Sequence, residues 1–227
     1  MQSSQFKLCA EVLRRLEREG VLKHVVLIAS WCLLAYEDFF ADVRYQPGIR
    51  TRDMDLLVPI PHRFDHDVDL EALLGDLDFV VSHKGRAGYM QFVHEELMIE
   101  FIVPERGRSS NKPFSIPALG VNAQPLRFMD FLAGNTIRAR FGEVRVTVPH
   151  PANFALLKLI VSTRRPAPVK RELDQRQAVE VLRALLDSGK KRSLRKVYRS
   201  MPKTWQKTVH KLLGELPLAE ELAAALS

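Results

Sequence analysis

The chain has 227 residues, of which 46% are hydrophobic, and it carries a formal net charge of +7. This length predicts one large domain or two small ones with a sizeable core. Two cysteines, Cys9 and Cys32, exclude a disulfide framework and a zinc site made by cysteines alone. No apolar run approaches a membrane span and no hydrophobic leader follows Met1, so we expect a cytoplasmic protein with no membrane partner.

The first part of the chain predicts alternating helices and short strands. Residues 3–20 place apolar side chains at helical spacing, and a short β-rich run over 24–30 leads into a second helix over 31–43. Another helix is expected over 68–77. Further strands are expected at residues 53–60, 78–84, 88–94 and 97–104.

The pattern changes after Pro149. Before it, residues 125–133, 135–142 and 143–151 predict more strands. After it, every segment has helical spacing. The expected helices cover residues 151–165, 168–189, 193–201, 204–216 and 218–226. We therefore expect an α/β half over residues 1–149 and a helical half over residues 150–227.

Two aspartates interrupt the apolar strand expected at residues 53–60. Asp53 and Asp55 are two residues apart, so their side chains project from the same face of a strand while Met54 faces the other way. Two carboxylates this close repel each other, and a divalent cation such as Mg²⁺ removes that repulsion. The pair therefore indicates a metal site. The alternative is structural: Asp53 pairs with Arg50 or Arg52, and Asp55 pairs with a helix.

Glu100 is the candidate for a third carboxylate. It lies between Ile99 and Phe101 in another apolar strand, where an unpaired charge is costly. If this strand neighbours the one with the aspartates, Glu100 joins them around metal. The alternative places Glu100 on the wet face of an edge strand.

A turn of small residues precedes these acids. Ala29 and Ser30 stand between an expected strand and an expected helix. The first N–H groups of a helix favour a phosphate, and the Ser30 hydroxyl adds a donor. Ser30 is equally suited to a plain helix cap.

The order "IASW…TRDMDLL…MIEFI" resembles the polymerase-β-like nucleotidyltransferase superfamily. That family has a small-residue turn, a helix, a strand with two acids and a later strand with the third. Residues 150–165 and 170–182 are also similar to the helical region of bacterial members, some of which belong to toxin–antitoxin or defence systems. The resemblance implies an α+β fold, with a mixed β-sheet flanked by helices and followed by a helical domain. Ala29 stands where the family usually has glycine, and Glu100 where it often has aspartate.

The resemblance also implies an activity: transfer of a nucleoside monophosphate from an NTP to a hydroxyl group, with Mg²⁺ or Mn²⁺. It makes Asp53, Asp55 and Glu100 both the catalytic and the metal-binding residues. Ser30 would contact the terminal phosphates, and Lys158 is the expected triphosphate contact beyond the core. Its alternative role is that of a lysine extending from an apolar helix face. The nucleotide-binding candidates are Ser30, Arg50, Arg52 and Lys158.

The acceptor is left open by the sequence. Residues 190–207 contain eight lysines or arginines and no acid, with Tyr198 and Trp205 among them. Such a surface suits an RNA backbone, such as a tRNA end, although a solvated helix face has the same composition. A protein hydroxyl, a small molecule and an antitoxin partner remain alternatives. Two other functions stay open: a catalytically silent member that binds nucleotide or a partner, and a basic RNA-binding module.

Overall fold

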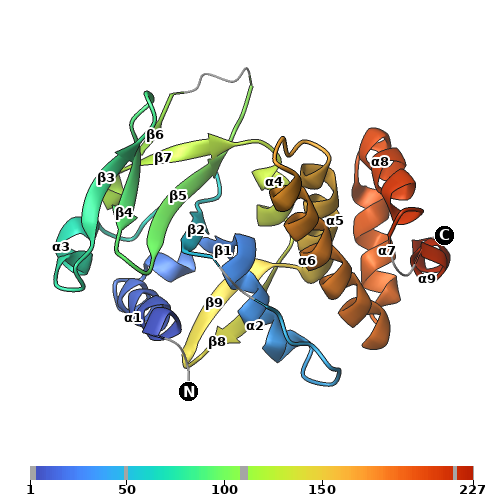
Figure 1. Ribbon diagram of the computed structural model, residues 1–227. Coiled ribbons are helices and arrows are strands. Elements are labelled where there is room, and N and C mark those ends of the chain that lie inside the picture. The colour runs from blue at the N-terminus through green and yellow to red at the C-terminus, as the bar shows by residue number, and fades with distance from the viewer. Residues whose placement is uncertain (1–3, 49–50, 108–111, 217–218, 227) are drawn as a thin grey trace. The chain divides into compact units, whose positions relative to one another are not determined.

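The computed structural model describes residues 4–48, 51–107, 112–216 and 219–226 (Figure 1). The helices are α1 (Ser4–Arg18), α2 (Cys32–Phe39), α3 (Leu70–Gly75), α4 (Met129–Ala133), α5 (Pro151–Ser162), α6 (Pro168–Asp187), α7 (Lys191–Ser200), α8 (Lys203–Leu213) and α9 (Ala219–Leu226). The strands are β1 (Val26–Ile28), β2 (Asp53–Leu57), β3 (Val80–Lys84), β4 (Tyr89–Val93), β5 (Met98–Pro104), β6 (Phe114–Ile116), β7 (Val121–Leu126), β8 (Thr136–Phe141) and β9 (Val144–Pro149). Short 3-10 segments are η1 (Val21–Lys23), η2 (Ala29–Trp31) and η3 (Pro117–Leu119).

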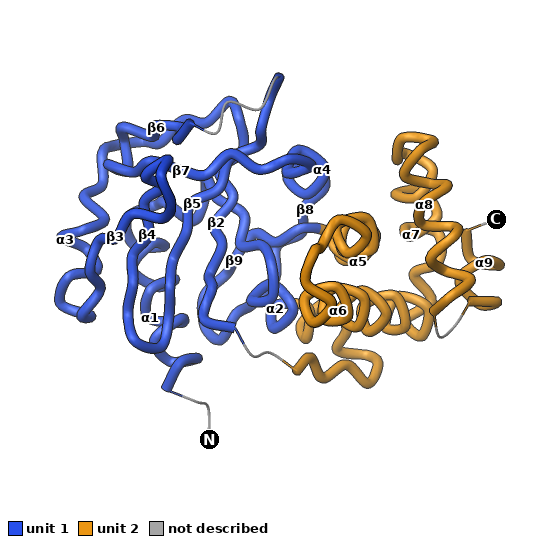
Figure 2. Tube along the Cα trace, turned by 45° about the horizontal axis from the view of Figure 1, so that its top comes forward, with its two compact units in different colours: residues 1–35, 49–149 blue, residues 36–48, 150–227 orange. Residues whose placement is uncertain are grey.

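The described chain divides into two compact units, shown in two colours in Figure 2. The first comprises residues 1–35 and 49–149, and the second comprises residues 36–48 and 150–227. Residues 36–48 therefore pack with the helical segments that come more than a hundred residues later. The expected division into domains at residue 149 stays a prediction.

A mixed sheet forms the centre of the first unit. Its strands run in the order β1-β2-β5-β4-β3, and β7 also pairs with β5 and with β6. The β2–β5 and β5–β7 pairs are parallel, while the β1–β2, β4–β5 and β3–β4 pairs are antiparallel. Strands β8 and β9 form a separate hairpin. This arrangement confirms the expected α+β fold with a mixed sheet and flanking helices.

The core of this unit follows from the alternation of side chains along its strands. Met54 and Leu56 on β2, together with Ile99 on β5, are almost completely buried on one face. Helix α1 buries Cys9, Val12, Leu13 and Leu16, which lie at helical spacing. The other face of the same strands carries Asp55 and Glu100 beside the buried apolar pair Leu57 and Ile102.

Helix α1 is fastened to the rest of the unit by side chains. The Gln5 amide donates to the carbonyl oxygens of Thr51, at 2.7 Å, and Glu96, at 2.8 Å. Phe6 stacks on Phe141 of β8 with ring centroids 4.9 Å apart. These contacts hold α1 beside the chain segment that leads into β2.

The second unit is helical. Pro151 and Pro168 stand in the first turns of α5 and α6, where a missing N–H costs no helical hydrogen bond. Helix α5 buries ten of its twelve residues, which explains its continuous apolar sequence. Tyr36 packs edge-on against Phe154 of α5, so residues 36–48 contribute to this core. No helix in the described segments is long and apolar enough to cross a bilayer.

One expected strand is wrong. Residues 125–133 do not form an extended segment, because β7 ends at Leu126 and helix α4 begins at Met129. Between them Phe128 has φ 72°, in the left-handed region and outside the β region of a regular strand. Strand β6 and most of β7 were also not predicted from the sequence.

Candidate active site

Strand β2 carries both aspartates. Asp53 is exposed and Asp55 is half-buried, whereas Met54 and Leu56 between and after them are buried. Alternation along the strand therefore turns both carboxylates away from the buried face.

Glu100 is the direct neighbour of Asp55 across the parallel β2–β5 pair. Residues paired in register project from the same face of a sheet, so Asp53, Asp55 and Glu100 share one face. On the other side of β2, Asp55 pairs with Ile28 of β1. The strands of Asp55 and Glu100 are thus neighbours, which is the condition for the three acids to meet on one face.

Glu100 is buried, and its carboxylate already has partners. The Lys84 ammonium donates to Oε1 at 2.8 Å and to Oε2 at 3.2 Å. The Gln91 amide, itself buried, also donates to Oε1. These donors offset the cost of burying a carboxylate in the sheet.

The turn after β1 lies next to these acids. Ile28, the partner of Asp55, is followed directly by η2, which contains Ala29 and Ser30 and leads into α2. Ala29 has φ 55°, in the left-handed region that favours glycine. The glycine usual in the resembled family thus has a physical reason here, since the turn needs a positive φ.

Two arginines precede β2. Arg52 is exposed, and its guanidinium donates to the carbonyl oxygen of His94 at 2.7 Å. Arg50 lies outside the described residues. The roles expected for both in binding nucleotide stay predictions.

Lys158 belongs to the second unit. Its ammonium lies 2.6 Å from Oδ1 of the buried Asp174, whose other oxygen accepts a hydrogen bond from Arg165 at 2.8 Å. Lys158 also lies 5.5 Å from the centre of the Phe154 ring. Lys158 is therefore engaged by Asp174 within the second unit, and its phosphate contact stays a prediction.

The donor chemistry suits a divalent ion only in part. Asp53 and Asp55 offer the carboxylate oxygens that Mg²⁺ and Mn²⁺ prefer. Both oxygens of Glu100 accept hydrogen bonds from Lys84 or Gln91. Among the residues described, no group of three or more His, Cys, Asp or Glu side chains is arranged to hold a metal ion.

Two residues of this site, Lys84 and Gln91, were not predicted from the sequence. Gln91 had a detectable signal, because a polar residue between Met90 and Phe92 must face away from the apolar side of its strand. Lys84 had no such signal, because it is the last residue of its strand, where a solvent-exposed lysine is common.

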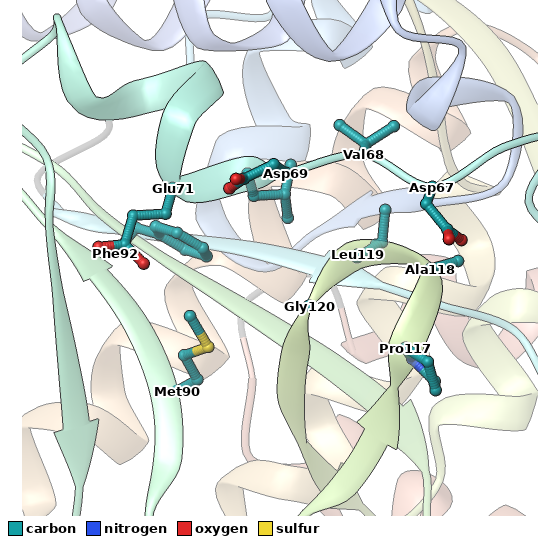
Figure 3. A pocket seen from close by; sticks show the side chains of 11 residues that line it. Asp67, Val68, Asp69, Glu71, Met90, Phe92, Pro117, Ala118, Leu119 and Gly120 are labelled. Atoms are coloured by element: carbon teal, nitrogen blue, oxygen red, sulfur yellow. The ribbon is translucent and has the colours of Figure 1, made fainter.

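A cavity of about 390 Å³ lies elsewhere in the first unit (Figure 3). Met90 and Phe92 line it from β4, and Phe92 pairs with Ile99, on the face opposite Glu100. Asp67, near the start of α3, also lines it. The cavity is therefore distinct from the acidic site.

Solved structures that match this chain include a nucleotidyltransferase-like protein and an antibiotic-resistance factor. A crystal structure of an antigenic nucleotidyltransferase-like protein from Paracoccidioides brasiliensis matches with a TM-score of 0.53 and 13% identity, over 100% of this chain and 94% of that one. The antibiotic-resistance factor ANT(2'')-Ia matches in a solution structure with a TM-score of 0.43 and 13% identity, over 85% of this chain and 95% of that one. Its crystal structure with adenylyl-2''-tobramycin gives a TM-score of 0.45 and 16% identity, over 82% of this chain and 98% of that one.

Comparison with curated proteins finds no match. The sequence matches a protein family described as Nucleotidyltransferase over residues 7–203, which include the turn, the three acids and most of the helical segments. This match confirms the resemblance drawn from the motifs. The chain belongs to the nucleotidyltransferase family.

Proposed function

We propose that this nucleotidyltransferase is metal-dependent and transfers a nucleoside monophosphate from an NTP to a hydroxyl group of an acceptor. The observation that supports this most is the register that sets Glu100 beside Asp55 on one sheet face, next to the Ala29–Ser30 turn. The acids can hold a cation that neutralises phosphate charge, and the turn can position the phosphates, which are the two needs of phosphoryl transfer.

Each part of the chain has a distinct task in this proposal. Asp53 and Asp55 would hold Mg²⁺ or Mn²⁺, which when bound neutralises charge on the phosphates. Ser30 and the N–H groups that open the helical segment would bind the terminal phosphates. The phosphate site would then lie at the end of β1, whose Ile28 pairs with Asp55.

The reaction itself is an in-line displacement. The acceptor oxygen forms a bond to the α-phosphorus, the bond from that phosphorus to the oxygen bridging to the β-phosphate breaks, and pyrophosphate leaves. The proton of the acceptor hydroxyl passes to a carboxylate of the site, for which Asp55 and Glu100 are the candidates.

Transfer of label from α-³²P NTPs tests this proposal. Each NTP is incubated with Mg²⁺, total cell RNA or protein, and either wild type or Asp55→Asn. We expect labelled acceptor with wild type and a reduction of on the order of 100-fold or more with Asp55→Asn, because a metal ligand contributes several kcal/mol to the transition state. Asp67→Asn, an exposed aspartate lining the distinct cavity, is the control and should leave transfer unchanged.

Two other outcomes have clear meanings. Metal-dependent NTP binding without release of pyrophosphate would indicate a catalytically silent member. RNA binding unaffected by Asp55→Asn, with no NTP binding, would indicate a basic RNA-binding module.

For the acceptor we propose RNA, because of the surface on α7 and α8. Lys191, Arg192 and Lys196 on α7 are exposed, as are Lys203 and Lys207 on α8. No acidic residue lies between residues 190 and 207. A run of cations with no acidic residue among them in sequence attracts a phosphate backbone.

The salt dependence of RNA binding tests the proposed acceptor. Replacing Lys196 and Lys203 with glutamine should weaken binding and reduce the slope of log K against log salt by about 0.7 for each phosphate that the protein no longer neutralises. Lys7→Gln, an exposed lysine on α1, serves as the matched control and should change neither. RNA as the acceptor would be contradicted if the label moves to a protein or a small molecule and the Lys196/Lys203 variant transfers as much label as wild type does.

A further inference from the structure

The third acidic position of this site is already occupied by a cation from the chain itself. Lys84 donates to both oxygens of Glu100, at 2.8 and 3.2 Å, and Gln91 donates to one of them. The Glu100 side chain is 9% exposed, whereas that of Lys84 is 48% exposed. The carboxylate is thus fixed inside the sheet, and its ammonium partner reaches it from a solvent-exposed position.

The register of three strands creates this arrangement. Gln91 on β4 pairs with Glu100 on β5, and Ser82 on β3 pairs with Gln91. Lys84, two residues after Ser82, therefore projects from the same face as Gln91, Glu100 and Asp55. All these residues belong to the first unit and to regular strands.

Such an ion pair changes what Glu100 can do for a metal ion. A divalent ion that used Glu100 would have to displace the ammonium or bind next to a like charge. Asp53 and Asp55 supply two carboxylates from the same sheet face, which suit such an ion without a contribution from Glu100. The positive charge beside Glu100 is supplied without a second metal.

We propose that Lys84 is a positioning residue that takes the place of a metal ion at Glu100, so that Asp53 and Asp55 alone hold a divalent ion. This inference rests on the proposed function, since it concerns the same site. Lys84 holds the Glu100 carboxylate in place beside Asp55, and removing Lys84 frees Glu100 to bind metal.

Mn²⁺ binding to the full chain, measured by electron paramagnetic resonance without nucleotide, tests the inference. Lys84→Met should tighten Mn²⁺ binding by on the order of tenfold, or add a second ion, because a nearby positive charge has been removed. Lys84→Arg keeps the charge and should bind as wild type does. Circular dichroism confirms that each variant is folded.

Glu100→Gln separates the inference from its alternative. With Lys84 present, Glu100→Gln should weaken Mn²⁺ binding far less than Asp55→Asn does, because no ligand is lost and only the Lys84 charge is left unpaired near the site. In the Lys84→Met background the same change should abolish the gain. The double variant leaves both positions neutral, so the result does not depend on an unpaired buried charge.

Three results would be decisive. If Glu100→Gln weakens Mn²⁺ binding in the presence of Lys84 as much as Asp55→Asn does, the inference is overturned. Binding that depends on Asp55 but is unchanged by Lys84→Met also overturns it, while leaving the proposed function intact. Binding that is insensitive to Asp55→Asn instead overturns the metal site of the proposed function.

Discussion

Ala29 shows how a single residue can be strained at a functional turn. Its φ of 55° lies in the left-handed region, which costs an ordinary L-residue about 1–2 kcal/mol. The conformation lets the chain leave β1 at Ile28 and enter η2 at once, which brings Ser30 close to the strand end beside Asp55. The turn therefore requires a positive φ at residue 29, and the methyl group of Ala29 makes that conformation strained.

We predict that Ala29→Gly stabilises the protein by about 0.5–1 kcal/mol, because relief of the strain exceeds the added entropy of the unfolded chain. Equilibrium unfolding in urea measures the change. Ala35→Gly is the control, since Ala35 is buried within the regular helix α2, and there glycine should destabilise by about 1 kcal/mol or more. An equal decrease in stability at both positions would contradict the strain argument.

At this scale the sequence reveals the acids but not their partners. Asp53, Asp55 and Glu100 stand out because charge is unusual in apolar strands, and the structure brings their strands together. Lys84 is 16 residues from Glu100, and only the register of β3, β4 and β5 joins them. An ion pair between residues on different strands depends on how the strands align, and local sequence patterns do not predict that alignment.

Helix α5 is an element whose start depends on one titratable side chain. His150 is its N-cap, and Nδ1 accepts a hydrogen bond from the Ala152 N–H at 3.2 Å. Burial lowers the pKa of His150 below its ordinary value. Both effects favour the neutral imidazole, because a protonated Nδ1 cannot accept the hydrogen bond.

We predict that acid weakens the fold through this cap. The unfolded chain takes up a proton on His150 near its ordinary pKa of about 6.5, while the folded chain does so only at lower pH. The contribution to the free energy of unfolding is therefore complete above about pH 6.5 and is lost as pH falls through the folded pKa.

His150→Asn tests this prediction, because asparagine caps helices well and does not titrate. The variant should show a smaller decrease in stability than wild type between about pH 6.5 and 5, measured by thermal unfolding. Other groups titrate in the same range, so the comparison is the difference between the two proteins. Identical slopes would contradict a role for His150.

Elements were predictable where one periodicity dominates. The helix over 168–189 and the strands over 78–84 and 88–94 are confirmed because their apolar spacing is unambiguous. Six of the nine residues 125–133 are apolar, so their spacing does not separate a period of 2 from one of 3.6. The left-handed conformation of Phe128 ends the extended segment there. Because Phe128 is not a glycine, the sequence does not indicate this conformation.

The units of the whole molecule are not continuous in sequence. The chain enters the second unit at residue 36, returns to the first at residue 49 and enters the second again at residue 150. Composition suggested a boundary only at Pro149, because the early segment has the pattern of an ordinary helix and loop. Its aromatic residues are what join it to the later helices: Tyr36 packs on Phe154, and Phe39 packs on His150.

We predict that residues 150–227 alone are much less stable than the same region in the full chain. Without residues 36–48 the fragment lacks the burial of Tyr36 and Phe40, each worth about 1.5–3 kcal/mol, from a total of roughly 5–15 kcal/mol. Heteronuclear NMR should show poor dispersion for the fragment, improved by adding a peptide of residues 36–48. Phe40→Ala in the full chain is the matched control and should cost about 3–5 kcal/mol. A well-dispersed spectrum of the fragment alone would contradict the prediction.

The split second unit also limits how this protein can exchange parts with its relatives. A recombination event that replaced everything after Pro149 would keep the host's Tyr36 and Phe39 while importing a foreign α5. Two distant gene segments would have to change together to preserve the aromatic packing. Chimeras made by a single crossover at that point should therefore fail more often than those that also transplant residues 36–48.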